Sequence, residues 1–282
     1  MLFRRTSHVA RGTGLRMYKE FYGLKDKPFS KTPDPRFLYL SAGHREALAR
    51  LQYVIEEREL ALLTGDIGCG KTTISRALMD LVGDAYHFCF IFNPRLTANE
   101  LLRVIARNLM VAVPPVAKDE LLREITEALY RFHNEKCCPV IVIDEAQMIT
   151  GREIFDEIRL LTNFQLDDRN LLSVIVMGQP ELRRMLAEPI YEPFRQRIAI
   201  NYHLFPLDLE ETMEYLDFRM EVAGGSPGLF SPDAVQRIYE FSGGVPRKIN
   251  VIATNALLEG FGRDAAFIDA AIIEDMADEL NL

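Results

Sequence analysis

The stretch "LALLTGDIGCGKTTISRALMDL", residues 60–81, constrains the fold of this chain more than any other. A short apolar run leads into a glycine-rich turn, and the turn leads into a segment with apolar residues at helical spacing. Residues 65–72 fit the pattern G-x-x-x-x-G-K-[ST] at every fixed position. A strand that turns through glycines into a helix is typical of α/β proteins with a parallel sheet.

This turn has the chemistry of a phosphate-binding loop. Glycines let successive backbone N–H groups point at phosphate oxygens, and the following helix presents its positive end to the same anion. In such a loop Lys71 reaches the β- and γ-phosphates, and the Thr72 hydroxyl is a ligand of Mg²⁺. The alternative is a glycine turn that binds nothing. The expected nucleotide-binding residues of the loop are Gly65, Asp66, Ile67, Gly68, Cys69, Gly70, Lys71, Thr72 and Thr73.

Two carboxylates follow an apolar run in "PVIVIDEAQ", residues 139–147. Because successive strand residues point to opposite sides, Asp144 and Glu145 can take different roles. We expect Asp144 to join the nucleotide site by holding the Mg²⁺ shell, through water, and Glu145 to orient and polarise the attacking water. The alternative is a strand that ends in two solvated acids. A water-activating glutamate argues against a small-molecule kinase, which must exclude water from the γ-phosphate, so the pair favours hydrolysis.

Short β-branched runs alternate with helical patterns, which predicts a parallel sheet with helices on both faces. Between the second and third runs, Leu122, Ile125, Leu129 and Phe132 lie at helical spacing and predict an amphipathic helix. The expected strands are 60–64, 87–92, 139–144, 171–177 and 198–204.

Only helical patterns remain after about Pro206. One of them opens with Ser231 as N-cap and Pro232 in the first turn. We therefore expect an α/β core of three layers over residues 17–206 and a small all-helical domain over 207–282. Residues 1–16 are expected to be a disordered extension.

Composition limits the partners of the chain. It is 48% hydrophobic and 26% charged, as in ordinary globular proteins, and no run approaches the ~18–20 apolar residues of a membrane span. The net charge is −8, but residues 1–36 carry +6 and the remainder −14. This acidity opposes tight nucleic-acid binding, although a local basic patch can still serve it.

The four cysteines lack metal-ligand spacing, which suits reduced thiols in a cytoplasm. Cys69 is expected to be a small loop residue, with a redox role as the alternative.

With both motifs placed, the chain resembles the AAA+ ATPases and, within them, the ExeA/GspA type, which is related to transposition ATPases of the TnsC/TniB type. The resemblance covers nearly all of residues 17–280. It implies a P-loop core with a helical lid, and ATP and Mg²⁺ as ligands; ATP over GTP rests on the resemblance alone. Besides the two motifs, it is carried by "MYKEFYGLKDKPFSKTPDPRFLYLSAGHREALARL" (17–51), "VMGQPELRRML", "FRQRIAINYHLFPL" and "SGGVPRKIN".

The resemblance also implies roles for individual residues. Gln179 follows the fourth strand, where a polar sensor contacts the γ-phosphate or water; the alternative is a loop-capping glutamine. Asn93 resembles the partner that restrains the catalytic glutamate, or is a turn asparagine. Arg195 and Arg197 precede the fifth strand, where this class places an arginine finger for a neighbouring subunit, although either could form a surface ion pair; Arg197 is preferred. Arg247 opens a lid helix and matches the second sensor, with helix capping as the alternative.

The aromatic segment Pro28–Leu40 is expected beside the adenine. Phe29, Phe37 and Tyr39 would form an apolar slot for the base, or they are core residues.

The leading hypothesis is a cytoplasmic Mg-ATPase that works as a homo-oligomer and drives or regulates assembly of a client complex for secretion, pili or polysaccharide export. Secretion ATPases of the ExeA type carry a membrane span and a peptidoglycan-binding region after the ATPase module, so with this chain ending at the helical domain we expect contact with the inner membrane only through a partner. A DNA-dependent ATPase that regulates transposition is the second hypothesis, favoured by the basic residues 1–36. A slowly cycling, nucleotide-stabilised scaffold is the third.

Overall fold

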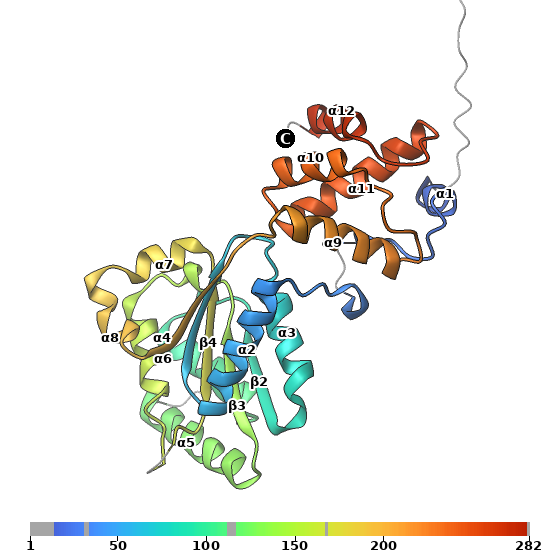
Figure 1. Cartoon of the computed structure of the whole chain (residues 1–282). Helices are drawn as coiled ribbons and strands as arrows, with labels where there is room; N and C mark the ends of the chain where they lie inside the picture. Colours follow the sequence, from blue (N-terminus) through green and yellow to red (C-terminus); the bar gives the residue numbers. More distant parts are fainter. Residues whose placement is uncertain (1–13, 31–33, 112–116, 167–168, 281–282) are drawn as a thin grey trace, which may run out of the picture. The chain divides into compact units, whose positions relative to one another are not determined.

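The computed structural model describes residues 14–30, 34–111, 117–166 and 169–280, which form two compact units (Figure 1). One unit spans residues 40–206, and the other combines the residues before Leu40 with those from Leu207 onward. Residues 1–13 of the predicted extension lie outside the described residues. Residues 14–16 are helical rather than disordered, because they open α1 (Gly14–Phe21).

The first unit is built on a parallel sheet of five strands in the order β2-β3-β4-β1-β5 (Figure 1). This confirms the predicted fold class, and each strand begins and ends within two residues of its predicted bounds. The strands are β1 (Leu60–Gly65), β2 (Tyr86–Ile91), β3 (Cys138–Ile143), β4 (Ser173–Gly178) and β5 (Ile198–Leu204).

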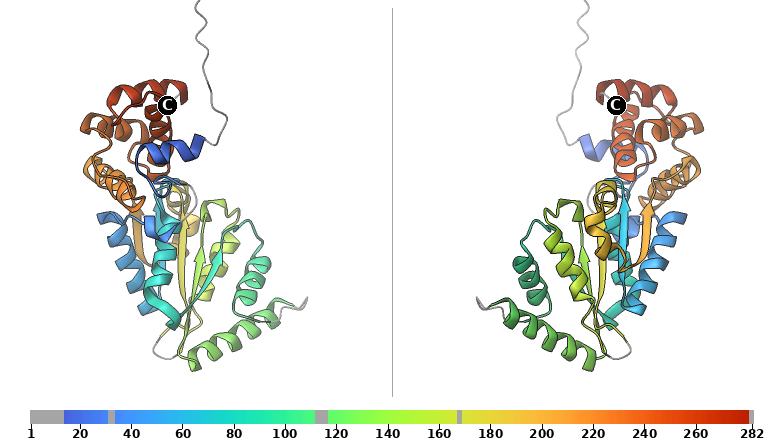
Figure 2. Two further views of the ribbon diagram at one scale, coloured as in Figure 1. Left: turned by 90° about the vertical axis from the view of Figure 1, so that its right-hand side faces the viewer. Right: turned by 90° about the vertical axis from the view of Figure 1, so that its left-hand side faces the viewer.

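Helices cover both faces of the sheet, because parallel strands need crossover connections and have no solvated face. α2 and α3 lie on one face, and α4, α5 and α6 lie on the other (Figure 2). Short 3₁₀ turns η2 (Gly83–Ala85), η3 (Ala146–Met148) and η4 (Pro189–Tyr191) complete the unit. The helices are α2 (Ala42–Glu57), α3 (Lys71–Val82), α4 (Ala98–Asn108), α5 (Lys118–Asn134), α6 (Arg152–Leu161), α7 (Pro180–Leu186) and α8 (Glu192–Arg195).

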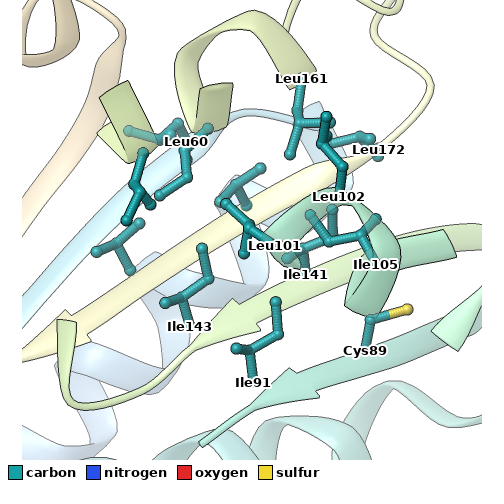
Figure 3. Packing of buried hydrophobic residues seen from close by; sticks show 14 of the residues in the cluster. Leu60, Cys89, Ile91, Leu101, Leu102, Ile105, Ile141, Ile143, Leu161 and Leu172 are labelled. Carbon is teal, nitrogen blue, oxygen red and sulfur yellow. The ribbon is translucent and has the colours of Figure 1, made fainter. Parts of the chain in front are cut away.

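The central strands β1, β3 and β4 are buried at every position. On the α4 face, side chains of β2 and β3 pack against that helix in a continuous apolar cluster (Figure 3). Each fully buried side chain of this size contributes roughly 1.5–3 kcal/mol. The cluster includes Ile91 and Ile143, the last residues of β2 and β3, and so extends to the carboxyl ends of these strands. Its labelled members include Cys89, Ile91, Leu101, Leu102, Ile105, Ile141 and Ile143.

α5 is the amphipathic helix that the sequence predicts. Ile125, Leu129 and Phe132 are buried, whereas Leu122 is only half-buried. Leu121 and Ala128 are buried as well, so the apolar stripe is rotated slightly from the predicted one.

The second unit is helical. Its α10 begins as predicted, because the Ser231 side chain accepts a hydrogen bond from the Ala234 N–H at 3.2 Å and Pro232 is the first helical residue. In the described ranges no helix is long and apolar enough to cross a membrane. The elements here are α1, η1 (Pro35–Phe37), α9 (Leu209–Val222), α10 (Pro232–Ser242), α11 (Pro246–Gly262) and α12 (Ala270–Leu280).

The segment before Leu40 packs in the helical unit, whereas the sequence analysis assigned it to the α/β core. Arg219 of α9 is buried, donates from Nε to the Pro28 carbonyl at 2.6 Å, and stacks over the rings of Phe37 and Tyr215 at 5.0 and 5.5 Å. Such contacts join residues nearly two hundred positions apart, which no local pattern reveals. The compact α/β unit therefore begins at Leu40 rather than at Met17.

The same packing supports the core alternative for Phe29 and Phe37, whereas the position of the segment beside an adenine stays a prediction. Phe29 and Phe37 belong to the apolar core of the helical unit, where they are 4% and 7% exposed. Tyr39 is half-buried, and its hydroxyl donates to Glu214 at 2.6 Å. Phe29 and Phe37 are core residues, the alternative that the sequence left open.

Candidate active site

The glycine-rich loop joins the carboxyl end of β1 to α3, as the sequence predicts. Gly68 and Gly70 have φ of +90° and +99°, values that few residues other than glycine adopt. Several backbone N–H groups of this turn donate to nothing in the described part of the chain. Unpaired N–H groups where a helix begins attract anions, so the loop fits a phosphate. These N–H groups belong to Gly68, Gly70, Lys71, Thr72 and Thr73.

Lys71 places an ammonium group inside this loop. Its side chain is 7% exposed, and Nζ donates to the carbonyl oxygens of Gly65 at 2.6 Å and Asp66 at 3.0 Å. Burial lowers the pKa of Lys71, whereas the nearby Glu145 and Asp144 carboxylates act in the opposite direction. A phosphate would give this buried cation a charged partner that the loop carbonyls do not supply.

Thr72 and Asp144 meet where a magnesium ion would be held. Thr72 Oγ1 donates to Asp144 Oδ2 at 2.6 Å, and Asp144 is 4% exposed. The Asp144 N–H donates to the Ile91 carbonyl at 2.9 Å, which extends the β2–β3 ladder by one residue. Hydroxyl and carboxylate oxygens suit Mg²⁺. Among the described residues no cluster of three His, Cys, Asp or Glu could hold a metal alone, so the ion would also need phosphate and water oxygens.

Glu145 departs from strand geometry. Its φ of 54° and ψ of 36° are left-handed, so a turn, rather than strand alternation, separates it from Asp144. This conformation is unfavourable for a side-chain-bearing residue and often marks functional sites. Glu145 Oε2 accepts hydrogen bonds from Gln147 Nε2 at 2.6 Å and from Gln179 Nε2 at 3.0 Å. Two amides thus hold one oxygen of the carboxylate.

Gln147 is a site residue that the sequence analysis did not assign. Its Oε1 accepts the Gln179 N–H at 3.1 Å, so Gln147 connects Glu145 to the end of β4. Gly178 leaves room for it, because a Cβ there would lie 3.0 Å from Gln147 Oε1. The only available signal was its place in "DEAQ", three residues after Asp144.

The two polar residues predicted to act near Glu145, Gln179 and Asn93, make different contacts. Gln179 lies beside Glu145, and its contact with a γ-phosphate or water stays a prediction. Asn93 is exposed, and its Oδ1 accepts the Arg95 N–H at 3.3 Å. Asn93 is therefore a turn asparagine here, and the side chains that hold Glu145 are Gln147 and Gln179.

The remaining loop residues differ in exposure. Asp66 and Ile67 are exposed at the tip, whereas Cys69 is fully buried. Burial raises the pKa of the Cys69 thiol to about 11, and a thiol that stays protonated at neutral pH is poorly reactive. The structure therefore supports the interpretation of Cys69 as a small packed residue.

Arg195 and Arg197 lie just before β5. Arg195 is half-buried, donates to the Ala187 carbonyl at 2.8 Å and pairs with Glu192. Arg197 is exposed, and among the described residues its guanidinium donates to the Asn163 side chain, at 3.0 Å. Both lie at the amino end of β5, which pairs with the start of β1, whereas the phosphate loop follows the end of β1. At ~3.3 Å per residue, β1 is about 16 Å long, and this length separates the two arginines from the phosphate loop.

Arg247 is the second residue of α11 and is exposed. It belongs to the helical unit, and its predicted role as second sensor remains a proposal.

Comparison with known proteins agrees with this geometry. Residues 54–186 match the family described as "AAA domain". General secretion pathway protein A of Aeromonas hydrophila is 39% identical over 254 residues, which cover 88% of this chain and 45% of that protein. Residues 54–186 form an AAA domain. The chain spans a little under half the length of that curated relative.

Solved structures share the fold of this chain. Cdc6p from Pyrobaculum aerophilum has a TM-score of 0.66 at 19% identity, covering 88% of this chain and 71% of that one. The ORC2 protein of Aeropyrum pernix has a TM-score of 0.66 at 17% identity, covering 91% and 72%. The RuvB branch migration motor of Thermotoga maritima has a TM-score of 0.58 at 17% identity, covering 87% and 74%. Identities this low show the fold alone.

Proposed function

We propose that this chain binds Mg-ATP at residues 65–73, hydrolyses it with Glu145, and works as a homo-oligomer on a partner complex. One observation carries the proposal. Unpaired loop N–H groups, the buried ammonium of Lys71, the Thr72–Asp144 pair and the amide-held Glu145 carboxylate all lie at the carboxyl edge of one sheet.

Each group has a distinct task in hydrolysis. The loop N–H groups and Lys71 bind the β- and γ-phosphates and stabilise the charge that develops as the terminal phosphoryl group leaves. The Thr72 hydroxyl and, through water, Asp144 would hold Mg²⁺, which supplies further positive charge at the phosphates.

Glu145 acts on the attacking water. Its Oε1 has no hydrogen-bond partner among the described residues, so this oxygen can accept a hydrogen bond from water and take its proton while the water oxygen attacks phosphorus. The bond between phosphorus and the ADP oxygen breaks in the same reaction. Gln147 and Gln179 restrict the carboxylate to one orientation, which keeps the base aligned.

Nucleotide binding tests this proposal directly. Lys71→Met keeps the volume of the side chain but removes the charge, so we expect the dissociation constant for Mg-ATP, measured by titration calorimetry, to rise about a hundredfold. Lys136→Met, at an exposed lysine before β3, is the matched control and should bind like the unchanged chain. Equal affinity of the Lys71 variant and the control would contradict the proposal.

The arginine geometry supports an oligomer. Arg197 lies at the opposite edge of the sheet from Lys71 of the same chain, about 16 Å along the strand, farther than an arginine side chain extends. Its side chain is exposed, and its guanidinium partner among the described residues is a neutral amide, so it can be released toward another molecule at little energetic cost. We propose Arg197 rather than Arg195 as the group that completes a neighbour's site.

The partner and the lid are further parts of the proposal. The similarity to General secretion pathway protein A supports a client in a secretion-type system at the cytoplasmic side of the membrane. Arg247 at the start of α11 would report the nucleotide state to the helical unit.

The alternatives differ in measurable ways. A DNA-dependent ATPase, favoured by the +6 charge of residues 1–36, predicts that duplex DNA raises turnover and binds less tightly as salt rises. A scaffold predicts tight ATP binding with negligible turnover at every protein concentration.

A further inference from the structure

His44 makes an unusual contact with the phosphate loop. It lies in the first turn of α2, more than twenty residues before the loop, and is 4% exposed. Its Nε2 lies 2.8 Å from the carbonyl oxygen of Cys69, and its Nδ1 lies 2.8 Å from the Ser41 hydroxyl. A buried imidazole thus connects the N-terminus of α2 to the backbone of the loop.

The chemistry of these partners assigns the ring protons. A carbonyl oxygen only accepts, so Nε2 carries a proton and donates to Cys69. In the neutral ring Nδ1 is then an acceptor, and the Ser41 hydroxyl donates to it. The same Ser41 oxygen accepts the His44 backbone N–H at 3.4 Å and caps the helix.

This contact also fixes the direction of a phosphate-binding N–H. The peptide bond between Cys69 and Gly70 is planar and trans, so its C=O and N–H point in opposite directions. When His44 holds the carbonyl, the Gly70 N–H points away from His44, and it is one of the N–H groups that are unpaired in the described chain. The imidazole therefore orients this donor before any anion arrives.

A second donor lies beside this contact. A carbonyl four residues earlier is the normal helical partner of a backbone N–H, and for Thr73 that carbonyl belongs to Cys69. This carbonyl accepts from His44, whereas the Thr73 N–H, in the first turn of α3, has no partner among the described residues. Glycine at position 70 is what permits the approach, because a Cβ there would lie 2.8 Å from His44 Nε2.

We propose that His44 is a positioning residue of the nucleotide site, which orients the Gly70 N–H through its hydrogen bond to Cys69. This inference rests on the proposed binding of ATP at the loop. His44 touches no phosphate itself and acts on affinity rather than on the water-activating step.

Two amide substitutions of His44 distinguish the roles of its two ring nitrogens. The amide nitrogen of His44→Gln can take the place of Nε2 and still donate to Cys69, whereas that of His44→Asn takes the place of Nδ1 and reaches only Ser41. We expect the dissociation constant for Mg-ADP to rise about tenfold or more in His44→Asn and to stay within about threefold of the unchanged chain in His44→Gln. Leu51→Ala, a buried change on the same helix away from the loop, should lower the unfolding temperature without this loss of affinity.

Equal affinities of the Asn and Gln variants would overturn the inference, provided that Lys71→Met has lost binding. If the unchanged chain does not bind nucleotide at all, the proposed function fails first. A second readout needs no variant: ¹⁵N NMR of the imidazole should show the neutral ring protonated at Nε2, and protonation at Nδ1 instead would also overturn the inference.

Discussion

At the scale of single residues, the site depends on which strand ends lie at the same edge of the sheet. Thr72 can donate to Asp144 because the loop after β1 and the end of β3 lie at one edge of a parallel sheet, with β4 between the two strands. Gln147 reaches Glu145 only because Glu145 adopts a left-handed conformation that bends the chain back.

Loss of the Gln147 amide should slow catalysis without weakening nucleotide binding. Gln147→Leu releases Glu145 from one of its two amide partners, so we expect kcat to fall about tenfold while the dissociation constant for Mg-ATP is unchanged. Gln236→Leu removes a similar amide–carboxylate bond on the surface of α10 and should leave kcat unaltered. A lower affinity with unchanged kcat in Gln147→Leu would contradict this role.

At the scale of elements, strands and helix starts followed from local pattern. The buried strands are apolar runs in the sequence, and Ser231 caps its helix through its side-chain oxygen, as predicted. The position of the segment before Leu40 could not be predicted, since Phe29 and Phe37 read equally well as core of either unit. Their packing against α9 depends on contacts such as Arg219 with Pro28, which are distant in sequence.

The turn between α10 and α11 provides a matched pair of glycines. Gly243 and Gly244 both have positive φ, +60° and +72°, but a Cβ on Gly244 would lie 1.8 Å from the Leu207 carbonyl oxygen, whereas one on Gly243 meets nothing within 4 Å. We expect Gly243→Ala to lower the free energy of unfolding by about 1 kcal/mol and Gly244→Ala by roughly 3 kcal/mol. Denaturant titration measures both, and equal effects would mean that the backbone contact with Leu207 does not limit the turn.

At the scale of the whole molecule, the proposed oligomer rests on the position of Arg197. Arg197 and the loop around Lys71 lie at opposite edges of one sheet, so an arginine finger at Arg197 would serve the site of a second copy. The sequence resemblance implied such a finger, and its role stays a prediction.

Turnover per chain should therefore rise with protein concentration. Arg197→Ala alone should lose most of its turnover, and so should Glu145→Gln alone. Mixing the two should restore part of the activity, because one interface in the mixture pairs an intact Arg197 with an intact Glu145. Arg184→Ala, at an exposed arginine of α7, is the control. Turnover that is independent of concentration, with no recovery on mixing, would contradict the oligomer.

The central claim is that ATP bound at the loop is hydrolysed by a water molecule that Glu145 activates. The most direct measurement is kcat for Mg-ATP in Glu145→Gln, with Mg-ATP affinity measured in parallel and Glu135→Gln, an exposed glutamate before β3, as control. The account predicts that the Glu145 variant binds Mg-ATP as tightly as the unchanged chain and turns it over at least about a hundredfold more slowly. A Glu145→Gln chain that hydrolyses ATP at the unchanged rate would contradict it.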